Sequence, residues 1–153
     1  MEDIILKKTL LALATSALVL TAVPTHEADA AKKYSTKYKK PSKNVVAVAR
    51  NIAAHRVYQY GANNNYAVDC SAFAQQVMRA MGKKIPRTTY AQMRAGKRVY
   101  KPRAGDLVFF NGGSHVGVYI GNGRMVDALN PYNGVGERRV DWVHGYVSGY
   151  YRY

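Results

Sequence analysis

The sequence predicts an α+β fold, with N-terminal helices packed on a C-terminal antiparallel β-sheet. Between residues 42 and 95, apolar side chains recur three or four positions apart, which is the period of helices that bury one face. From residue 106 onward, short apolar stretches alternate with turns rich in glycine and asparagine, which is typical of antiparallel strands. Because the helices precede the strands, we expect one domain of the α+β class over residues 42–153.

The first 30 residues are typical of a secretory signal peptide. Lys7 and Lys8 precede an apolar run from Leu10 to Val23, and Ala28-Asp29-Ala30 offers a cleavage site. The apolar run is shorter than the roughly 20 residues of a transmembrane helix, so a retained membrane anchor is the less favoured alternative. We therefore expect export to the periplasm, the cell wall or the extracellular space, with no stable membrane span after cleavage.

The charge balance predicts an anionic neighbour. The chain has 23 lysines and arginines against 9 acidic residues, and 21 basic and 5 acidic residues remain once residues 1–30 are removed. Residues 31–41 contain five lysines and no apolar period, so we predict a flexible basic tether there. Its expected partners are anionic envelope polymers or membrane, although surplus lysine that only improves solubility is an open alternative. No nucleic-acid partner is expected, because no nucleic-acid-binding signature is present.

Three helices are expected before the sheet. Ser42 can cap a first helix that ends near Arg56 and buries one apolar face. A loop rich in turn formers then leads to a second helix, which Asp69 caps and Gly82 ends. Thr88 is a possible cap for a short third helix over residues 87–93.

The expected strands follow a turn at Gly105. They are Asp106–Phe110, Val116–Ile120, Arg124–Ala128 and, in a less regular pattern, residues 138–142 and 146–153. A Gly121-Asn122-Gly123 turn joins the second and third of these strands, which is a strong hairpin signal.

Cys70 is the only cysteine of the chain, and it lies in the first turn of the second predicted helix. Such a position favours the thiolate over the thiol, because unpaired backbone N–H groups and the positive end of the helix dipole surround it. The alternative is a small buried apolar residue. We identify Cys70 as a candidate nucleophile.

His115 and Asp127 are the candidate partners of this nucleophile. A nucleophilic cysteine needs an imidazole within hydrogen-bond reach, and His115 lies at the start of an apolar strand after Gly112-Gly113. Asp127 is the only charged residue among apolar neighbours on the next strand and can orient the imidazole. The alternatives are a surface histidine in a turn and a charge on an edge strand.

Strand geometry tests this pairing. A two-residue Asn122-Gly123 turn in unbroken register would place His115 and Asp127 on opposite faces of the sheet. A three-residue loop or a bulge shifts the register by one residue, so that Gly117 opposes Asp127 and His115 becomes its diagonal neighbour. We predict an odd-length loop or a bulge in this hairpin.

Six sequence blocks in this order resemble the NlpC/P60 family of papain-like bacterial cell-wall cysteine peptidases, over about residues 45–153. The blocks are Tyr58-Gln-Tyr-Gly61, Asp69-Cys-Ser-Ala-Phe73, Pro86-Arg-Thr-Thr-Tyr-Ala-Gln92, Gly105-Asp-Leu-Val-Phe-Phe110, His115-Val-Gly-Val-Tyr-Ile-Gly121 and Met125-Val-Asp-Ala128. The resemblance implies a papain-like core and hydrolysis of peptide bonds in peptidoglycan. The bond is commonly the one between D-isoglutamate and diaminopimelate or lysine, or in some small exported members the D-Ala cross-link.

The resemblance also implies roles for single residues. Cys70 is expected as the nucleophile, His115 as the base and Asp127 as the third member of a triad. The resemblance places Tyr58 beside the oxyanion site, and it places Asp69 and Ser71 where a substrate amine is recognised.

Two glycines of the family pattern are replaced here, by Ala62 and Ala72, and we expect a tighter groove from these added methyl groups. The four histidines and one cysteine show no metal-ligand spacing, so we expect neither a metal nor another cofactor. We expect the domain to act as a monomer on peptidoglycan stem peptides. An acyltransferase on the same scaffold and a catalytically idle wall-binding module are the alternatives.

Overall fold

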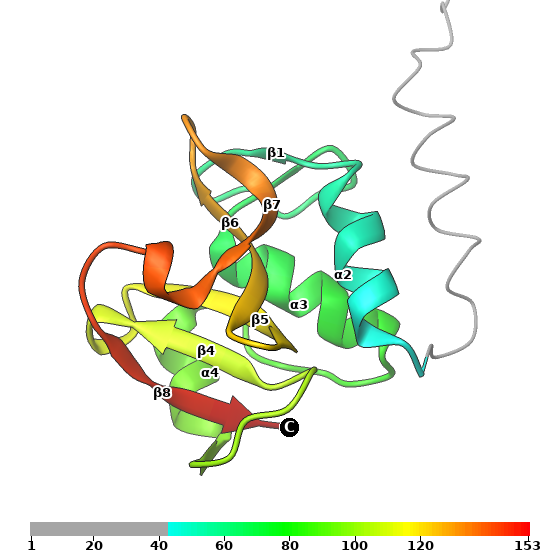
Figure 1. The fold of residues 1–153 in the computed structure, drawn as a ribbon. Coiled ribbons are helices and arrows are strands. Elements are labelled where there is room, and N and C mark those ends of the chain that lie inside the picture. The colour runs from blue at the N-terminus through cyan, green and yellow to red at the C-terminus, as the bar shows by residue number, and fades with distance from the viewer. Residues whose placement is uncertain (1–42) are drawn as a thin grey trace, which may run out of the picture.

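The computed structural model describes residues 43–153, and in this part of the chain three helices pack against an antiparallel sheet (Figure 1). The helices are α2 (Val45–Ala53), α3 (Cys70–Ala80) and α4 (Thr89–Ala95). The predicted α+β class is correct. The predicted signal peptide and basic tether lie outside the described residues.

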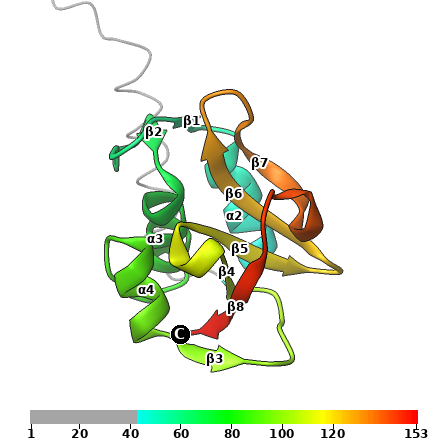
Figure 2. The ribbon, with the colours of Figure 1, turned by 90° about the vertical axis from the view of Figure 1, so that its left-hand side faces the viewer.

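The main sheet has six strands in the order β3-β8-β4-β5-β6-β7, and all neighbours are antiparallel (Figure 2). The strands are β3 (Lys97–Val99), β8 (Val147–Arg152), β4 (Leu107–Phe110), β5 (His115–Gly121), β6 (Arg124–Asn130) and β7 (Gly134–Arg139). The strand β8 comes late in the chain yet lies between β3 and β4. Strand β3 therefore has its only partner in the sheet in β8.

A second, small sheet was not predicted. Its two strands, β1 (Val57–Tyr58) and β2 (Ala67–Val68), pair in parallel. They are too short for a periodic signal, since each contributes only two residues. The pair matters for the site, because Val68 leads directly into the helix that carries Cys70.

Each helix begins at a polar cap. The side chain of Asn44 accepts a hydrogen bond from the Ala47 N–H and caps α2, so the predicted Ser42 cap is wrong. Asp69 caps α3 and Thr88 caps α4, as predicted, through hydrogen bonds from the N–H groups three residues further on. These caps satisfy first-turn donors that the helices themselves leave unpaired.

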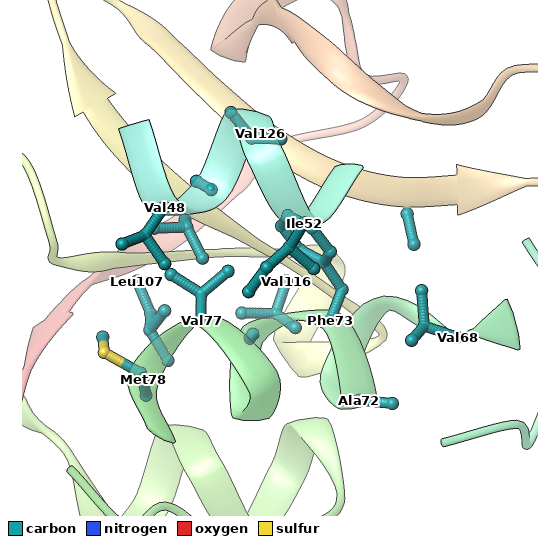
Figure 3. Close-up of a cluster of buried hydrophobic side chains, with 14 of the residues drawn as sticks. Val48, Ile52, Val68, Ala72, Phe73, Val77, Met78, Leu107, Val116 and Val126 are labelled. Atoms are coloured by element: carbon teal, nitrogen blue, oxygen red, sulfur yellow. The ribbon is translucent and has the colours of Figure 1, made fainter. Parts of the chain in front are cut away.

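The main core lies between the helices and one face of the sheet. Figure 3 shows Val48 and Ile52 of α2 facing Phe73 and Val77 of α3. The buried members of this core from the sheet are Leu107, Phe109, Val116, Val118, Val126 and Ala128. Each large apolar side chain buried here contributes about 1.5–3 kcal/mol relative to an exposed one.

The four apolar residues of β4 are buried on both faces of the sheet. Leu107 and Phe109 join the core under the helices, whereas Val108 and Phe110 join a smaller cluster on the other face. That cluster also contains Tyr119, Met125 and Val140. The continuous apolar run of β4 therefore reflects a central strand with both faces covered.

The hairpin between β5 and β6 contains the predicted bulge. Gly121 pairs with Arg124 around a two-residue turn, and the register then shifts by one residue between Tyr119 and Gly121. Of the two predicted alternatives, the three-residue loop is wrong and the bulge is confirmed. Beyond the bulge Val118 pairs with Val126, and the same register places Gly117 opposite Asp127.

The strand predicted over residues 138–142 is only partly correct. Strand β7 begins earlier, at Gly134, and ends at Arg139. Residues Val140–Trp142 form a 3-10 turn, η2, which lets Val140 pack into the outer cluster. The tyrosine-rich stretch that follows forms β8, as expected.

Candidate active site

Cys70 is the first residue of α3 and lines a groove of about 900 Å³. The chain reaches it from β2 through Asp69, whose backbone N–H donates to the Ala62 carbonyl at 3.1 Å. Cys70 is partly exposed, while most of α3 behind it is buried. The thiol therefore faces the groove beside first-turn amides that can hold an anion.

The imidazole of His115 and the carboxylate of Asp127 lie side by side. Nε2 of His115 is 2.7 Å from Oδ2 of Asp127, which is a short charge-assisted hydrogen bond. The two residues are 8 % and 0 % exposed, so the pair is shielded from water. The Nε2 bond leaves Nδ1 as the imidazole nitrogen available to Cys70.

The surroundings of His115 favour its protonated form. Burial lowers the pKa of His115, but hydrogen bonds to Asp127 and Cys70 and the negative charges of both raise the pKa to about 9. The imidazole is therefore a cation at neutral pH when Cys70 is a thiolate. The Cys70-His115 ion pair is the form of a cysteine nucleophile that is ready to attack.

Gly117, opposite Asp127, is packed closely against Met125. A Cβ atom built on Gly117 would lie 2.5 Å from Sδ of Met125 and 3.4 Å from Cβ of Asp127. No larger residue fits there without moving its neighbours. The missing side chain of Gly117 thus leaves the space that the Met125 side chain occupies beside Asp127.

Arg138 is the site residue that the sequence reasoning missed. It lies on β7, next to β6, and its Nε donates to Oδ1 of Asp127 at 2.5 Å. The β6-β7 pairing shifts register between Ala128 and Asn130, so the local pattern gave no alignment for this contact. The only sequence signal for this contact was the position of Arg138 in a stretch with the pattern of a strand, two residues after Gly136.

Asp69 and Ser71 lie at the groove, but their polar groups are already engaged. Arg87 donates to both carboxylate oxygens of Asp69, at 2.9 and 2.7 Å, and its Nη1 lies 2.7 Å from Oγ of Ser71. Burial opposes the charged form of Asp69, but the hydrogen bonds from Arg87, Ala72 and Ser71 outweigh it and hold the pKa of Asp69 below its usual range. The carboxylate is therefore ionised and paired with Arg87.

Tyr58 also lines the groove, as the last residue of β1. Burial raises the pKa of Tyr58, and the charges of Cys70 and Asp69 raise it further. Its hydroxyl is therefore a neutral donor at physiological pH. Such a donor close to Cys70 can contribute to holding a developing oxyanion.

The far wall of the groove is formed by segments from the second half of the chain. It includes Asn130 and Asn133 around the β6-β7 turn and residues 142–144, which begin at the last residue of η2. Asn111 fixes this wall, because its side chain bonds the carbonyl of His144 and the N–H of Tyr146. Exposed aromatic rings, Tyr60, Tyr90 and Trp142, line the groove as well.

Among residues 43–153, no cluster of three or more histidine, cysteine, aspartate or glutamate side chains could hold a metal ion. Within the same residues, none of the helices has the length and hydropathy needed to cross a membrane.

Two curated relatives are similar to part of this chain. The probable endopeptidase p60 of Listeria welshimeri is 41% identical over 103 residues, which are 64% of this chain and 18% of that protein. The murein DD-endopeptidase MepS/murein LD-carboxypeptidase of Escherichia coli K12 is 44% identical over 77 residues, which are 46% of this chain and 41% of that protein. The chain thus spans about a fifth of the Listeria relative and less than half of the Escherichia coli one.

Two solved structures share the fold. An NlpC/P60 family protein from Bacillus cereus ATCC 10987 superposes with a TM-score of 0.65 at 27% identity, covering 74% of this chain and 40% of that one. The NlpC/p60 domain of the peptidoglycan hydrolase SagA superposes with a TM-score of 0.62 at 27% identity, covering 72% and 97%. The NlpC/P60 family also matches residues 55–150, well over half of the sequence, and the chain therefore belongs to the NlpC/P60 family.

Proposed function

We propose that this protein is an exported cysteine peptidase that hydrolyses peptide bonds in the stem peptides or cross-links of peptidoglycan. One observation carries the proposal: Cys70 opens a helix at the groove, and the buried, hydrogen-bonded pair of His115 and Asp127 lies beside it. Family membership supports it, because the similar proteins above are named a probable endopeptidase, a murein DD-endopeptidase and a peptidoglycan hydrolase.

The reaction begins with attack of the Cys70 thiolate on the scissile carbonyl carbon. The Cys70 backbone N–H holds the oxyanion, together with the neutral hydroxyl of Tyr58. His115 then passes its proton to the departing amine, the C–N bond breaks, and a thioester remains on Cys70.

Water completes the cycle. His115 is now neutral and accepts a proton from a water molecule, which attacks the thioester carbonyl. The carboxylic acid leaves, and Cys70 and His115 regain their charges. Asp127 keeps the imidazole in one orientation throughout, because its Oδ2 accepts the hydrogen bond from Nε2.

The experiment is a digest of purified sacculi and of defined cross-linked muropeptides, analysed by mass spectrometry. The wild-type protein is expected to release fragments with one new amine and one new carboxyl terminus per cut, and Cys70→Ser is expected to release none. Intact substrate with the wild-type protein would overturn the proposal, and binding without products would identify an idle wall-binding module. A parallel digest with an added acceptor amine separates hydrolysis from acyl transfer, because a transferase yields the amide of that acceptor.

A further inference from the structure

Asp127 has two charged partners, one on each carboxylate oxygen. Oδ2 bonds Nε2 of His115 at 2.7 Å, and Oδ1 bonds Nε of Arg138 at 2.5 Å. The side chain of Asp127 is 0% exposed and that of Arg138 is 10% exposed. A carboxylate held on both oxygens has one orientation available, and that orientation points Oδ2 at the imidazole.

The guanidinium of Arg138 is itself held by the turn that follows β6. Its Nη2 lies 3.4 Å from the carbonyl oxygens of both Asn133 and Gly134. The guanidinium carbon lies 5.4 Å from the centre of the Trp142 ring, within the range of a cation-π contact. Asn133 and Trp142 line the groove, so Arg138 connects the buried carboxylate to the groove wall.

The charges around the site balance only when Arg138 is counted. The ionised site has two anions, the Cys70 thiolate from α3 and Asp127 from β6, and two cations, His115 from β5 and Arg138 from β7. Nearby, at the N-cap of α3, Asp69 is paired with Arg87, and Tyr58 on β1 stays neutral. Without Arg138 a buried site would carry a net negative charge, which a low-dielectric environment disfavours.

We propose that Arg138 is a positioning residue that holds the carboxylate of Asp127 aimed at His115, and thereby sets the pH range in which the Cys70-His115 pair is reactive. The catalytic part of this inference rests on the proposed peptidase function. The ion-pair part does not, because the reactivity of Cys70 is measured without any substrate.

The positive charge of Arg138 predicts the direction in which the rate–pH profile moves when that charge is removed. Removing a cation makes proton loss harder for every group around it, so Arg138→Gln is expected to move both limbs of the rate–pH profile to higher pH. The pH midpoint of Cys70 alkylation should move the same way, by on the order of one pH unit for charges several ångströms apart at an effective dielectric of about 20. The rate at the optimum should also fall, by about 10²-fold, because the imidazole is no longer aligned.

Arg138→Lys separates charge from geometry. A lysine restores the positive charge but offers no Nε beside a second nitrogen, so it cannot reproduce both the Asp127 bond and the carbonyl contacts. The limbs and the alkylation midpoint are then expected near their wild-type values, while the rate at the optimum stays low. The neighbouring Arg139 provides the matched control, because it pairs with the exposed Asp141 and Arg139→Gln removes the same charge.

The test measures iodoacetamide alkylation of Cys70 and muropeptide hydrolysis from pH 5 to 10 for the wild-type protein, these three variants and Asp127→Asn, alone and with Arg138→Gln. Among the single variants, only Arg138→Gln is expected to move the rate–pH profile and the alkylation midpoint to higher pH. Adding Arg138→Gln to Asp127→Asn is expected to cause no further loss of rate. A uniform loss of rate at every pH, with an unmoved alkylation midpoint, would show that Arg138 is only a structural residue.

Two further outcomes are decisive. If Arg138→Gln does not fold, Arg138→Lys carries the test, and wild-type rates in that variant would overturn the positioning role. If the wild-type protein hydrolyses no muropeptide, the proposed function fails, while the alkylation midpoints still decide whether Arg138 supports the ion pair.

Discussion

The reactivity of Cys70 depends on one imidazole. With a pKa of about 9, His115 is a cation at neutral pH and stabilises the thiolate beside it. Iodoacetamide should therefore alkylate Cys70 rapidly well below pH 8.5, roughly the ordinary pKa of a cysteine. In His115→Ala the alkylation rate should regain the ordinary pH dependence and hydrolysis should fall by about 10²–10⁴-fold. His55→Ala is the control, since His55 is exposed and bonds the Asn51 carbonyl away from the groove.

The same pKa predicts how activity ends at high pH. His115 must be protonated to donate to the leaving amine, so hydrolysis should decline as the pH rises through about 9. Asp127 raises this pKa, hence Asp127→Asn should move the alkaline limb toward the ordinary histidine value, opposite in direction to Arg138→Gln. The measurement is kcat/KM against pH for each variant. An alkaline limb that stays in place in Asp127→Asn would remove Asp127 from the triad.

Residues that act through local chemistry could be predicted from the sequence. Asp69 caps its helix and presents Cys70 because capping needs only neighbouring residues. Arg138 could not be predicted, because its contact depends on the register of β7 after an irregular turn. The engagement of Asp69 by Arg87 was also missed, since 18 residues separate the two and no period relates them.

At the scale of elements, the β5-β6 hairpin determines whether His115 and Asp127 meet. Its register followed from the sequence because side chains alternate along a strand, so only a shift of one residue places both on the same face. Asp127 lies between two glycines, Gly117 on β5 and Gly136 on β7. These two positions differ in the space around them, and that difference can be measured.

Gly117→Ala is expected to destabilise the fold and separate the pair. The added Cβ would lie 2.5 Å from Sδ of Met125, a clash within a buried cluster that costs about 1–3 kcal/mol of unfolding free energy. At Gly136 the nearest atom to an added Cβ is 3.9 Å away, so Gly136→Ala is the matched control and should change stability by less than about 0.5 kcal/mol. Denaturant unfolding and hydrolysis rates test both variants. Equal stability of the two would contradict the packing argument.

Across the whole molecule, charge is distributed unevenly. All five acidic residues within 43–153 bond an arginine: Asp69, Asp106, Asp127, Glu137 and Asp141. Between residues 70 and 105 the sequence contains no acidic residue and nine basic ones. Eight of these are exposed, namely Arg79, Lys83, Lys84, Arg94, Lys97, Arg98, Lys101 and Arg103. The folded domain therefore presents unopposed positive charge in addition to the lysines of residues 31–41.

Both sources of charge should contribute to wall binding. Using Cys70→Ala to prevent turnover, we expect deletion of residues 31–41 to weaken sacculus binding and to reduce its salt dependence. Binding that remains should still fall with salt, and Lys97→Glu with Lys101→Glu should lower it further. Arg139→Glu is the control, because that arginine already pairs with Asp141. Unchanged binding after the deletion would show that the tether has no such role.

The position of β8 was not predictable from local patterns, because a strand inserted between two earlier ones leaves no trace in their periodicity. It also imposes an order of events on the emerging chain. Strand β3 has its only sheet partner in β8, and the carboxylate of Asp106 accepts a hydrogen bond from Arg152. The groove residue Asn111 is bonded by Tyr146, which directly precedes β8. A polypeptide still threading through a ribosome or a translocation channel thus lacks two of the six strands of this sheet until β8 has come out, and the wall of its groove is not fixed until Tyr146 has come out. Cys70 emerges more than seventy residues earlier, yet the pocket that directs it is completed at the end.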